Sequence, residues 1–462
     1  MHLRHAAAIL ALATTFASAQ TKTPPRTWVD KDTGHRVWRL TDEPNSGAFY
    51  FNVNDYTPDH KTLIYTAPDG IHTLDMATKK TKLLVPNPPR QPGERFGGVH
   101  AIIAGSKTNS VFYSQANPET HVITLYKADV YTGAITKLTD LPPRMSVATI
   151  NADETLGAGT INDSADAVNF GDKRVPPPGL AADAPHVQAA NKGQMMEERL
   201  AARIPLTLYT INLQTGKLTA LLHSTDWVNH LLFSPTDPTL LMYCHEGPWQ
   251  KVDRIWMIHT DGTHNTLIHK RSIANEIAGH EFWGIDGRTI WYDWQPIKGQ
   301  DFYLAGYDLA TGKKTAYHMD RNDWSIHFNL TADLDLFCGD GGDPGQVAKA
   351  PDGEWIELFH PQLLSTKGSL NEPTFFQPGI FHPEHLVNMS QHNYKAEPNV
   401  RFSPDKSLVL FSSNMFGPSY VFAAETAKAV NPPAAEVLST PELAYSFNPV
   451  KTAPIHPPAP VQ

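Results

Sequence analysis

The sequence has few cysteines, no strongly basic segment and no long apolar run in its interior. It contains 2 Cys in 462 residues, too few for the disulfide framework of a small secreted scaffold. Cys244 and Cys338 each lie in an apolar strand pattern, so we expect buried thiols rather than a disulfide. No interior run reaches the roughly 18 apolar residues that a membrane span needs. The formal net charge of −9, without a block of Lys or Arg, argues against a nucleic-acid or anionic membrane surface.

The N-terminal segment has the organisation of a secretory signal peptide. Arg4 gives a positive start, an apolar run extends from Ala6 to Phe16, and Ala17-Ser18-Ala19 supplies small residues for cleavage. We therefore expect residues 1–19 to be removed and the mature protein to be exported, most naturally to a periplasm.

Proline and glycine, by contrast, are abundant and spread along the whole chain. The 38 Pro and 30 Gly accompany a hydrophobic fraction of 41%. This composition suits many short elements better than long helices. By length alone the chain could hold two or three domains, but all-β propellers of this size form one unit.

A turn followed by an alternating apolar strand recurs along the chain. Its clearest copies have the form Ser/Thr/Asn-Pro/Ala-Asp, as in Thr57-Pro58-Asp59 and Ser403-Pro404-Asp405. The seven copies begin at Thr57, Gly105, Asn151, Ser234, Gly284, Thr331 and Ser403. Repetition of one supersecondary unit at this period predicts the blades of a β-propeller, with about four strands in each.

A second signature, an Asp-x-x-Thr-Gly hairpin between two strands, follows most of these turns. The start of the mature chain, from Asp30 to Thr41, carries only this second half of the unit. An outer strand at the N-terminus would complete the last blade and remove exposed sheet edges. The sequence therefore predicts an all-β fold, a seven-bladed β-propeller over residues 28–425 that is closed by an N-terminal outer strand.

Two gaps in the repeat spacing predict insertions. Asn151 and Ser234 are 83 residues apart and Thr331 and Ser403 are 72 apart, whereas the other copies are separated by 46 to 50 residues. We expect insertions at about 161–205, with a charged helix near its end, and at about 341–385, each either a lid or surface decoration. Residues 426–462 form a C-terminal extension that is Pro-rich at its end.

Polar residues stand just ahead of several repeat turns. His230, His280, His327 and Asn399 lie four to six residues ahead of the Asp-turns of their repeats. Equivalent positions in successive blades face the same end of the ring. One such histidine alone is ordinarily a satisfied strand-end group, but the set predicts convergence on a site.

Neutral imidazoles with a carboxylate and an amide suit a divalent ion of the Mn or Zn type. His280 with Glu397, Asn399 and His392 could form that shell, although the spacing matches no zinc-binding signature. No Gly-x-Ser-x-Gly elbow, P-loop or dinucleotide fingerprint occurs in a strand–helix context, which disfavours serine hydrolase and nucleotide chemistry.

Several segments resemble the oligogalacturonate lyases. They are Arg203-Ile204-Pro205, Asn229-His230, Cys244-His245-Glu246-Gly247-Pro248, Gly279-His280-Glu281-Phe282-Trp283, Gly339-Asp340-Gly341 and Phe402-Ser403-Pro404-Asp405. The resemblance implies a seven-bladed propeller polysaccharide lyase that acts on short pectin fragments by β-elimination. It also implies a manganese-type ion held by three histidines and a glutamine.

Some positions of this sequence match the functional residues of the family, and others differ from them. His280 matches the first metal histidine of the family. The family's Gln-x-x-His-Pro-His run reads Tyr394-Lys395-Ala396-Glu397-Pro398-Asn399 here, so Glu397 and Asn399 stand where two histidines are expected and Tyr394 where the glutamine is expected. His392 is close enough in sequence to substitute. His230 and Arg203 fall near the family's base and substrate-binding positions.

Elimination from a 4-linked uronate requires removal of the C5 proton beside a neutralised carboxylate. His230 is the expected base because imidazole titrates near neutral pH, with Arg203 and His245 as further catalytic candidates. Arg199, His327 and Tyr394 are the expected substrate-binding residues, and Tyr394 could also protonate the departing oxygen. The expected partner is an oligogalacturonide.

Three other functions fit parts of the pattern. A propeller lyase could act on another uronate polymer, such as ulvan, with His and Tyr chemistry and little or no metal. A non-catalytic periplasmic propeller of the TolB-like class would need no titratable loops. A hydrolase would need paired carboxylates, for which Glu246 and Glu281 are the candidates.

Overall fold

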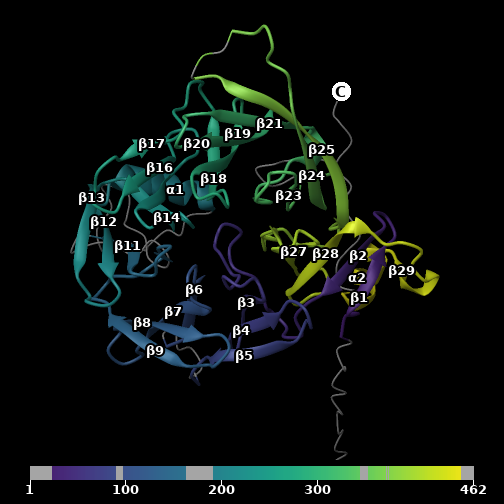
Figure 1. The fold of residues 1–462 in the computed structure, drawn as a ribbon, viewed down its shortest axis with the longest axis horizontal. Coiled ribbons are helices and arrows are strands. Elements are labelled where there is room, and N and C mark those ends of the chain that lie inside the picture. The colour runs from purple at the N-terminus through teal and green to yellow at the C-terminus, as the bar shows by residue number, and fades with distance from the viewer. Residues whose placement is uncertain are drawn as a thin grey trace, which may run out of the picture.

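The computed structural model describes residues 23–89, 97–162, 191–343, 352–370, 372 and 374–448. The expected signal peptide, residues 1–19, lies outside them, as do parts of both expected insertions and the Pro-rich C-terminal end. The described chain is mostly β, and its sheets follow one another around a ring (Figure 1). The prediction of a mostly-β fold with several four-stranded sheets is confirmed.

The first four sheets are each built from strands consecutive in sequence. The first contains β3 (Thr62–Ala67), β4 (Gly70–Asp75) and β5 (Thr81–Pro86). The second contains β6 (Val99–Ala104), β7 (Ser110–Ala116), β8 (Ile123–Asp129) and β9 (Ile135–Asp140). The third contains β10 (Thr149–Ile150), β11 (Leu156–Asn162), β12 (Leu206–Asn212) and β13 (Leu218–Ser224). The fourth contains β14 (Trp227–Phe233), β15 (Leu240–Glu246), β16 (Ile255–His259) and β17 (Thr266–Leu267).

The next sheet has eight strands and divides into two consecutive groups of four. The first group is β18 (Ile277–Trp283), β19 (Thr289–Gln295), β20 (Phe302–Asp308) and β21 (Lys314–Met319). The second is β22 (Phe328–Leu330), β23 (Phe337–Gly339), β24 (Trp355–Leu363) and β25 (Phe376–Asn388). The groups join where β21 pairs in parallel with β25.

The segment expected as an insertion at 341–385 contains β24 and most of β25. These strands have 9 and 13 residues and pair antiparallel along their length. Much of the additional chain therefore forms a long hairpin that completes a sheet. The spacing between repeat turns does not distinguish such a hairpin from an inserted loop.

The last sheet combines the two ends of the described chain. It contains β26 (Arg401–Phe402), β27 (Leu408–Ser413), β28 (Tyr420–Lys428), β2 (His35–Arg39), β1 (Thr27–Asp30) and β29 (Val437–Leu438). β2 pairs antiparallel with β28, the closing contact that the sequence predicts. The C-terminal extension adds η2 (Ala434–Glu436), β29 beside β1, and α2 (Thr440–Phe447). Trp28 Nε1 donates to Thr440 Oγ1 at 2.8 Å, so the extension belongs to this sheet.

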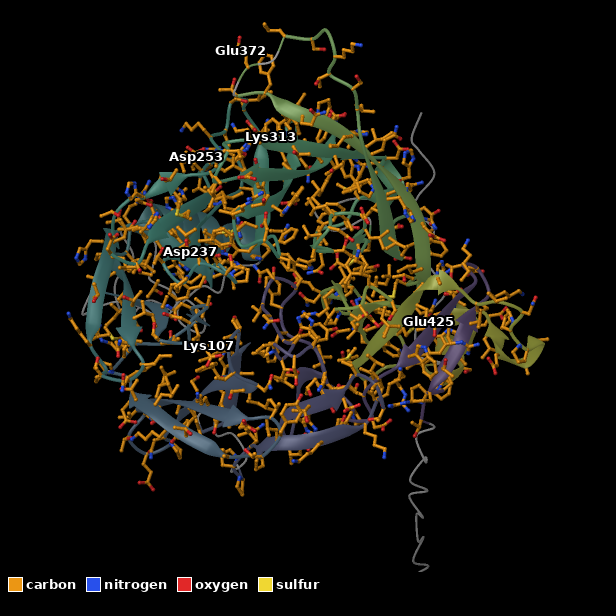
Figure 2. The ribbon with its side chains drawn as sticks, in the orientation of Figure 1. Lys107, Asp237, Asp253, Lys313, Glu372 and Glu425 are labelled. Atoms are coloured by element: carbon orange, nitrogen blue, oxygen red, sulfur yellow. The ribbon has the colours of Figure 1, made fainter. Side chains whose placement is uncertain are left out.

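Hydrophobic clusters lie between neighbouring sheets. Figure 2 shows the side chains that project from the strands into these spaces. Ile64 of β3 and Val111 of β7 share one cluster, and Leu63 of β3 and Leu410 of β27 share another, so packing continues from the last sheet to the first. Cys244 and Cys338 are free and buried, as expected. Of the helices described, none has the length and apolar character to cross a membrane.

The charged segment expected to be helical forms α1 (Lys192–Ala202). The side chain of Asn191 caps its first turn by accepting from the backbone N–H of Gln194 at 3.0 Å. The helix ends at Arg203, whose φ of 48° is left-handed. This geometry carries Arg199 and Arg203 to the start of β12, beside β14.

Candidate functional site

Three histidines in consecutive groups of strands each contact a buried carboxylate. Each histidine lies on or immediately before the first strand of its group, and each carboxylate lies on or immediately after the second. The pairs are His230 with Glu246 at 3.0 Å, His280 with Asp293 at 3.1 Å, and His327 with Asp340 at 2.6 Å. The first strands β14 and β18 lie toward the inside of the ring (Figure 1). The histidines that recur at equivalent positions of the sequence repeats therefore also make equivalent contacts in the structure.

Irregularities in strand pairing determine the direction of two of these histidine side chains. The register of β14 with β15 shifts between Asn229 and Leu232, and that of β18 with β19 shifts between Gly279 and Phe282. His230 and His280 adopt φ values of 48° and 45° at these shifts. A left-handed non-glycine residue costs of order 1–3 kcal/mol, and a bulge redirects a side chain out of the pleat. The strain is repeated at equivalent positions, which marks these residues as functional candidates.

The carboxylates determine which ring nitrogen remains for a ligand. A carboxylate only accepts hydrogen bonds, so the nitrogen that faces it carries the proton. Nε2 of His230 faces Glu246, which leaves Nδ1, and Nδ1 of His280 faces Asp293, which leaves Nε2. Histidines oriented in this way are stronger bases and better metal ligands.

Tyr50 joins this cluster from the loop before β3. Its hydroxyl lies 3.2 Å from Nε2 of His327, and its ring centroid lies 6.0 Å from that of His230. Burial, followed by the negative charges of Glu397 and Glu281, raises the pKa of Tyr50 well above its usual value. The hydroxyl therefore stays protonated. Tyr50 is not among the site residues that the sequence predicts, although it lies ahead of the first repeat turn much as the histidines lie ahead of theirs.

Arg254 bridges the two carboxylates that a hydrolase would need. Its guanidinium lies 3.2 Å from both Glu246 and Glu281, and all three side chains are buried. Burial raises the pKa of Glu246, but His230 and Arg254 outweigh it, so that pKa is lowered. At Glu281, burial raises the pKa and the positive charge of Arg254 lowers it, and the net result is a lowered pKa. Both groups are buried carboxylates held by one arginine, so neither is suited to act as a hydrolase acid.

Arg203 and His245 meet at Asp226. Arg203 forms an ion pair with Asp226, and Nε2 of His245 lies 3.0 Å from the same carboxylate. Burial lowers the pKa of His245, and Asp226 opposes this only in part. Arg203 is 55% exposed, so its side chain is accessible to a ligand.

Arg199 lies over the indole of Trp227, with its guanidinium carbon 3.8 Å from the ring centroid. Both residues line a small cavity of about 110 Å³ together with Asn229, the neighbour of His230. The predicted substrate-binding arginine is thus close in the fold to the predicted base. A cationic side chain and an aromatic face are groups that bind an acidic sugar.

The structure does not gather all four predicted metal ligands. Both ring nitrogens of His392 are engaged, one with Ser413 Oγ at 3.0 Å and one with the Ala396 carbonyl at 2.7 Å. The Asn399 amide accepts from the backbone N–H of Phe51 and donates to the Glu397 carbonyl. The side chains of His392 and Asn399 are therefore engaged in contacts with neighbouring protein groups.

Tyr394 is also turned inward. It is 5% exposed, and its hydroxyl donates to the Asp340 carbonyl at 3.4 Å. Burial raises the pKa of its hydroxyl. The expectation that Tyr394 contacts substrate does not agree with this burial, whereas Tyr50 occupies a position from which a proton could be donated.

His280, His327 and Glu397 nevertheless suit a divalent ion. The His280 and His327 rings are 5.1 Å apart, and each is oriented through Nδ1 by a buried carboxylate, an arrangement common among metal-bound histidines. Glu397 Oε2 lies 4.0 Å from His327 Nε2. Two imidazoles and a carboxylate form a donor set for manganese or zinc. His327, which we expected to bind substrate, thereby takes the place expected for His392.

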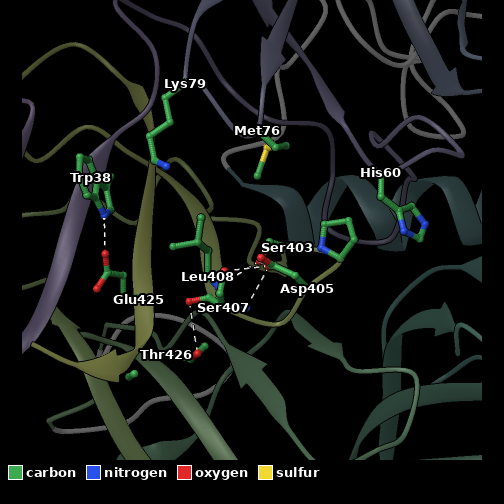
Figure 3. A pocket seen from close by; sticks show the side chains of 12 residues that line it. Trp38, His60, Met76, Lys79, Ser403, Asp405, Ser407, Leu408, Glu425 and Thr426 are labelled. Atoms are coloured by element: carbon green, nitrogen blue, oxygen red, sulfur yellow. Dashed lines mark hydrogen bonds between the residues drawn. The ribbon is translucent and has the colours of Figure 1, made fainter.

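A larger pocket, with a volume of about 530 Å³, lies elsewhere (Figure 3). It is bordered by Trp38 of β2, the Ser403–Leu408 turn and Glu425 of β28. Glu425 accepts from Trp38 Nε1 at 2.9 Å, and Asp405 is used within its own turn. The pocket contains none of the histidines of the candidate site.

Comparisons with known proteins agree on one family. The model of the family described as oligogalacturonate lyase matches residues 192–430. An oligogalacturonide lyase of Pectobacterium atrosepticum is 27% identical over 238 residues, which are 48% of this chain and 56% of that protein. The chain thus spans about half the length of the curated relatives it matches.

Two solved structures share the fold over most of their length. The oligogalacturonate lyase of Vibrio parahaemolyticus has a TM-score of 0.65 and 21% identity, with 87% of this chain and 96% of that chain covered. An oligogalacturonate lyase in complex with manganese has a TM-score of 0.62 and 21% identity, with 89% and 96% covered.

The fold and the repeated histidine–carboxylate pairs define a mostly-β protein whose four-stranded sheets surround a polar site. Two solved oligogalacturonate lyases share this fold. The chain belongs to the oligogalacturonate lyase family.

Proposed function

We propose that the protein is a polysaccharide lyase that cleaves short oligogalacturonides by β-elimination, on a seven-bladed β-propeller. The observation that carries this proposal is the alignment of His230, His280 and His327, each oriented by its own buried carboxylate. Such side chains can move a proton and neutralise a uronate, which are the two requirements of the reaction.

Seven blades are supported by the packing of the described residues. Seven hydrophobic clusters are found there, and each joins neighbouring groups of strands. The eight-stranded sheet counts as two blades because it divides into two groups of four at the β21–β25 contact. The sheet of β3, β4 and β5 gains an inner bridge between Tyr56 and Leu63.

His230 removes the C5 proton of the uronate. Glu246 holds its Nε2, so the free Nδ1 is the accepting atom, and the buried negative charge of Glu246 stabilises the imidazolium that results. Arg254 and Asn229, which both contact Glu246, keep that carboxylate ionised and in place. The base is thus oriented by a network and not by a single contact.

Tyr50 donates a proton to the departing glycosidic oxygen. Its raised pKa suits an acid rather than a base, and its contacts with His327 and the His230 ring support this role. Arg199 with Trp227, and the exposed Arg203, bind carboxylates and sugar faces of the neighbouring residues.

A divalent ion, with manganese the expected one, would be held by His280, His327 and Glu397. When bound, it supplies Lewis-acid neutralisation of the uronate carboxylate, which acidifies the C5 proton. Asp293 and Asp340 orient the two histidines for this role.

The test is ultraviolet absorbance of the unsaturated product during incubation of the full chain with digalacturonate and trigalacturonate. We expect a rise that EDTA abolishes and manganese restores, and that is lost in His230→Ala. Absence of a rise with either substrate under every metal condition would overturn the proposal.

The Tyr50–His230 arrangement also favours a second candidate, elimination from another uronate polymer such as ulvan. A tyrosine acid and a histidine base act at the C5 proton and the leaving oxygen, which all 4-linked uronates share. Glu397 and Asn399 stand where the resemblance expects two histidines, which points in the same direction. A rise with ulvan oligosaccharides and none with galacturonates would select this candidate.

A further inference from the structure

A second cluster of ligating side chains lies outside the histidine site. Asp323, Glu357 and His385 each present one ligand atom, and these atoms lie within 4.8 Å of one another. In the part of the chain that the structure describes, this is the group of His, Cys, Asp or Glu side chains that meets that distance. None of the three belongs to the segments that carry the family resemblance.

The fold fixes the three residues relative to one another. Glu357 of β24 and His385 of β25 are directly opposite in the antiparallel register, so their side chains share a face. Asp323 ends η1 (Arg321–Asp323), which follows β21, the other neighbour of β25. Trp355 stacks on the His385 ring with centroids 4.3 Å apart, which orients Nε2 toward the carboxylates. Nε2 lies 3.4 Å from Glu357 and 4.0 Å from Asp323.

Glu357 has no hydrogen-bond donor for either carboxylate oxygen among the described residues, although it is 0% exposed. A buried carboxylate in this condition is costly, and Asp323 adds a second buried acid beside it. Burial raises the pKa of Glu357, and the charges of Asp323 and Asp352 raise it further. A bound cation would satisfy both oxygens and remove the repulsion between the two acids.

We propose that Asp323, Glu357 and His385 bind a divalent ion of the zinc or manganese class. An imidazole beside two carboxylates suits these ions, whereas calcium and magnesium prefer oxygen ligands alone. Metal–ligand bonds of about 2.0–2.2 Å place the ligand atoms of one ion about 3–4 Å apart, which is the range of the distances from His385 Nε2 to the two carboxylates. His385 is 36% exposed and provides a path for entry. The ion ties η1 to the β24–β25 hairpin and so stabilises the junction of two groups of strands.

Equilibrium dialysis of the full chain against zinc, and separately against manganese, followed by elemental analysis, tests this site. We expect Glu357→Gln to lose one bound ion per chain relative to the wild type, and His385→Ala, at a partly exposed position, to do the same. Added metal should raise the melting temperature of His280→Ala, in which this site remains, but not of the double variant His280→Ala with Glu357→Gln. Equal stoichiometry in the wild type and both single variants, and equal thermal shifts in His280→Ala and the double variant, would overturn the proposal.

Glu276→Gln is the matched control. Glu276 is also buried beside a histidine, but its oxygens accept hydrogen bonds from His269, Trp294 and the Ser272 backbone. Its substitution should leave metal stoichiometry unchanged. The ion held near His280 is assayed separately, because His280→Ala removes that ion alone. A wild type that binds one ion and a Glu357→Gln variant that binds none would support this site and count against the metal of the proposed lyase.

Discussion

The hydroxyl of Tyr50 lies 3.2 Å from Nε2 of His327, a residue 277 positions further along the chain. His327 Nδ1 faces Asp340, so Nε2 accepts from the Tyr50 hydroxyl here. A metal ion on Nε2 would use the same lone pair and so release the hydroxyl for proton donation. Phe51 stacks on the His327 ring at 4.5 Å and donates its backbone N–H to Asn399. The loop before β3 therefore connects the first strands of distant groups at one site.

Tyr50→Phe should lower kcat for uronate elimination by about 10²-fold or more, because it removes the acid but preserves the ring contacts with Phe51 and His230. The initial rate of product absorbance gives kcat and KM. We expect KM to change little. Tyr394→Phe is the control, since its hydroxyl is buried and donates to the Asp340 carbonyl. Equal losses in the two variants would contradict the assignment.

Asp293→Asn should weaken manganese binding by about 10–100-fold, because the carboxylate that orients His280 is lost while the imidazole remains. Titration of activity against manganese concentration, alongside calorimetric titration, measures the effect. Excess manganese should restore much of the rate. Asp286→Asn, in the exposed turn after β18, is expected to leave manganese affinity as in the wild type. Unchanged affinity in Asp293→Asn would remove His280 from the ligand set.

The repeat turns predict much of this fold because each is a local signal. Asp286, for example, accepts from the backbone N–H groups of Arg288 and Thr289, which is what an Asp-Gly turn requires. The positions of His230, His280 and His327 follow from the same repetition. The repeat also explains β2, because the start of the mature chain carries only the second half of the repeat unit. The pairing of β2 with β28 completes that unit.

The side-chain contacts between different segments could not be predicted from the sequence, because they depend on strand register and side-chain rotamers. The sequence does not reveal that His392 turns to Ser413 and Ala396, or that Tyr394 is buried. Tyr50 lies ahead of the first repeat turn, but this position alone does not predict a functional role, because aromatic residues ahead of a strand are usually core. Spacing predicts an insertion where the β24–β25 hairpin stands, since strand length is set by pairing with β21 and not by the turn that precedes it.

Glu276 should make folding stability depend on acid pH. Burial raises its pKa, but hydrogen bonds from His269, Ser272 and Trp294 prevail and lower it to about 2, below the usual value near 4.5. A depressed carboxylate pKa stabilises the folded state above the unfolded-state pKa, and this contribution is lost as pH falls from about 5 toward 2. The difference in urea unfolding free energy between wild type and Glu276→Gln should therefore shrink over that range. A difference that stays constant with pH would contradict the assignment.

Arg254→Met should destabilise the fold by about 3–5 kcal/mol, because it leaves Glu246 and Glu281 buried without their shared cation. Urea denaturation at neutral pH measures the loss. The loss should diminish at acid pH, since both carboxylates have lowered pKa values in the wild type and become neutral when protonated.

Two further variants separate this effect from general damage to the fold. Arg288→Met removes an exposed arginine that pairs with Asp286 and Asp308, and should cost no more than about 1 kcal/mol. Adding Glu281→Gln to Arg254→Met should recover part of the stability, because one of the two uncompensated charges disappears. Activity should remain low in the double variant, since Glu246 still lacks the guanidinium that helps hold it against His230. If stability is not recovered, the cost of Arg254→Met comes from lost packing against Trp249 and not from buried charge.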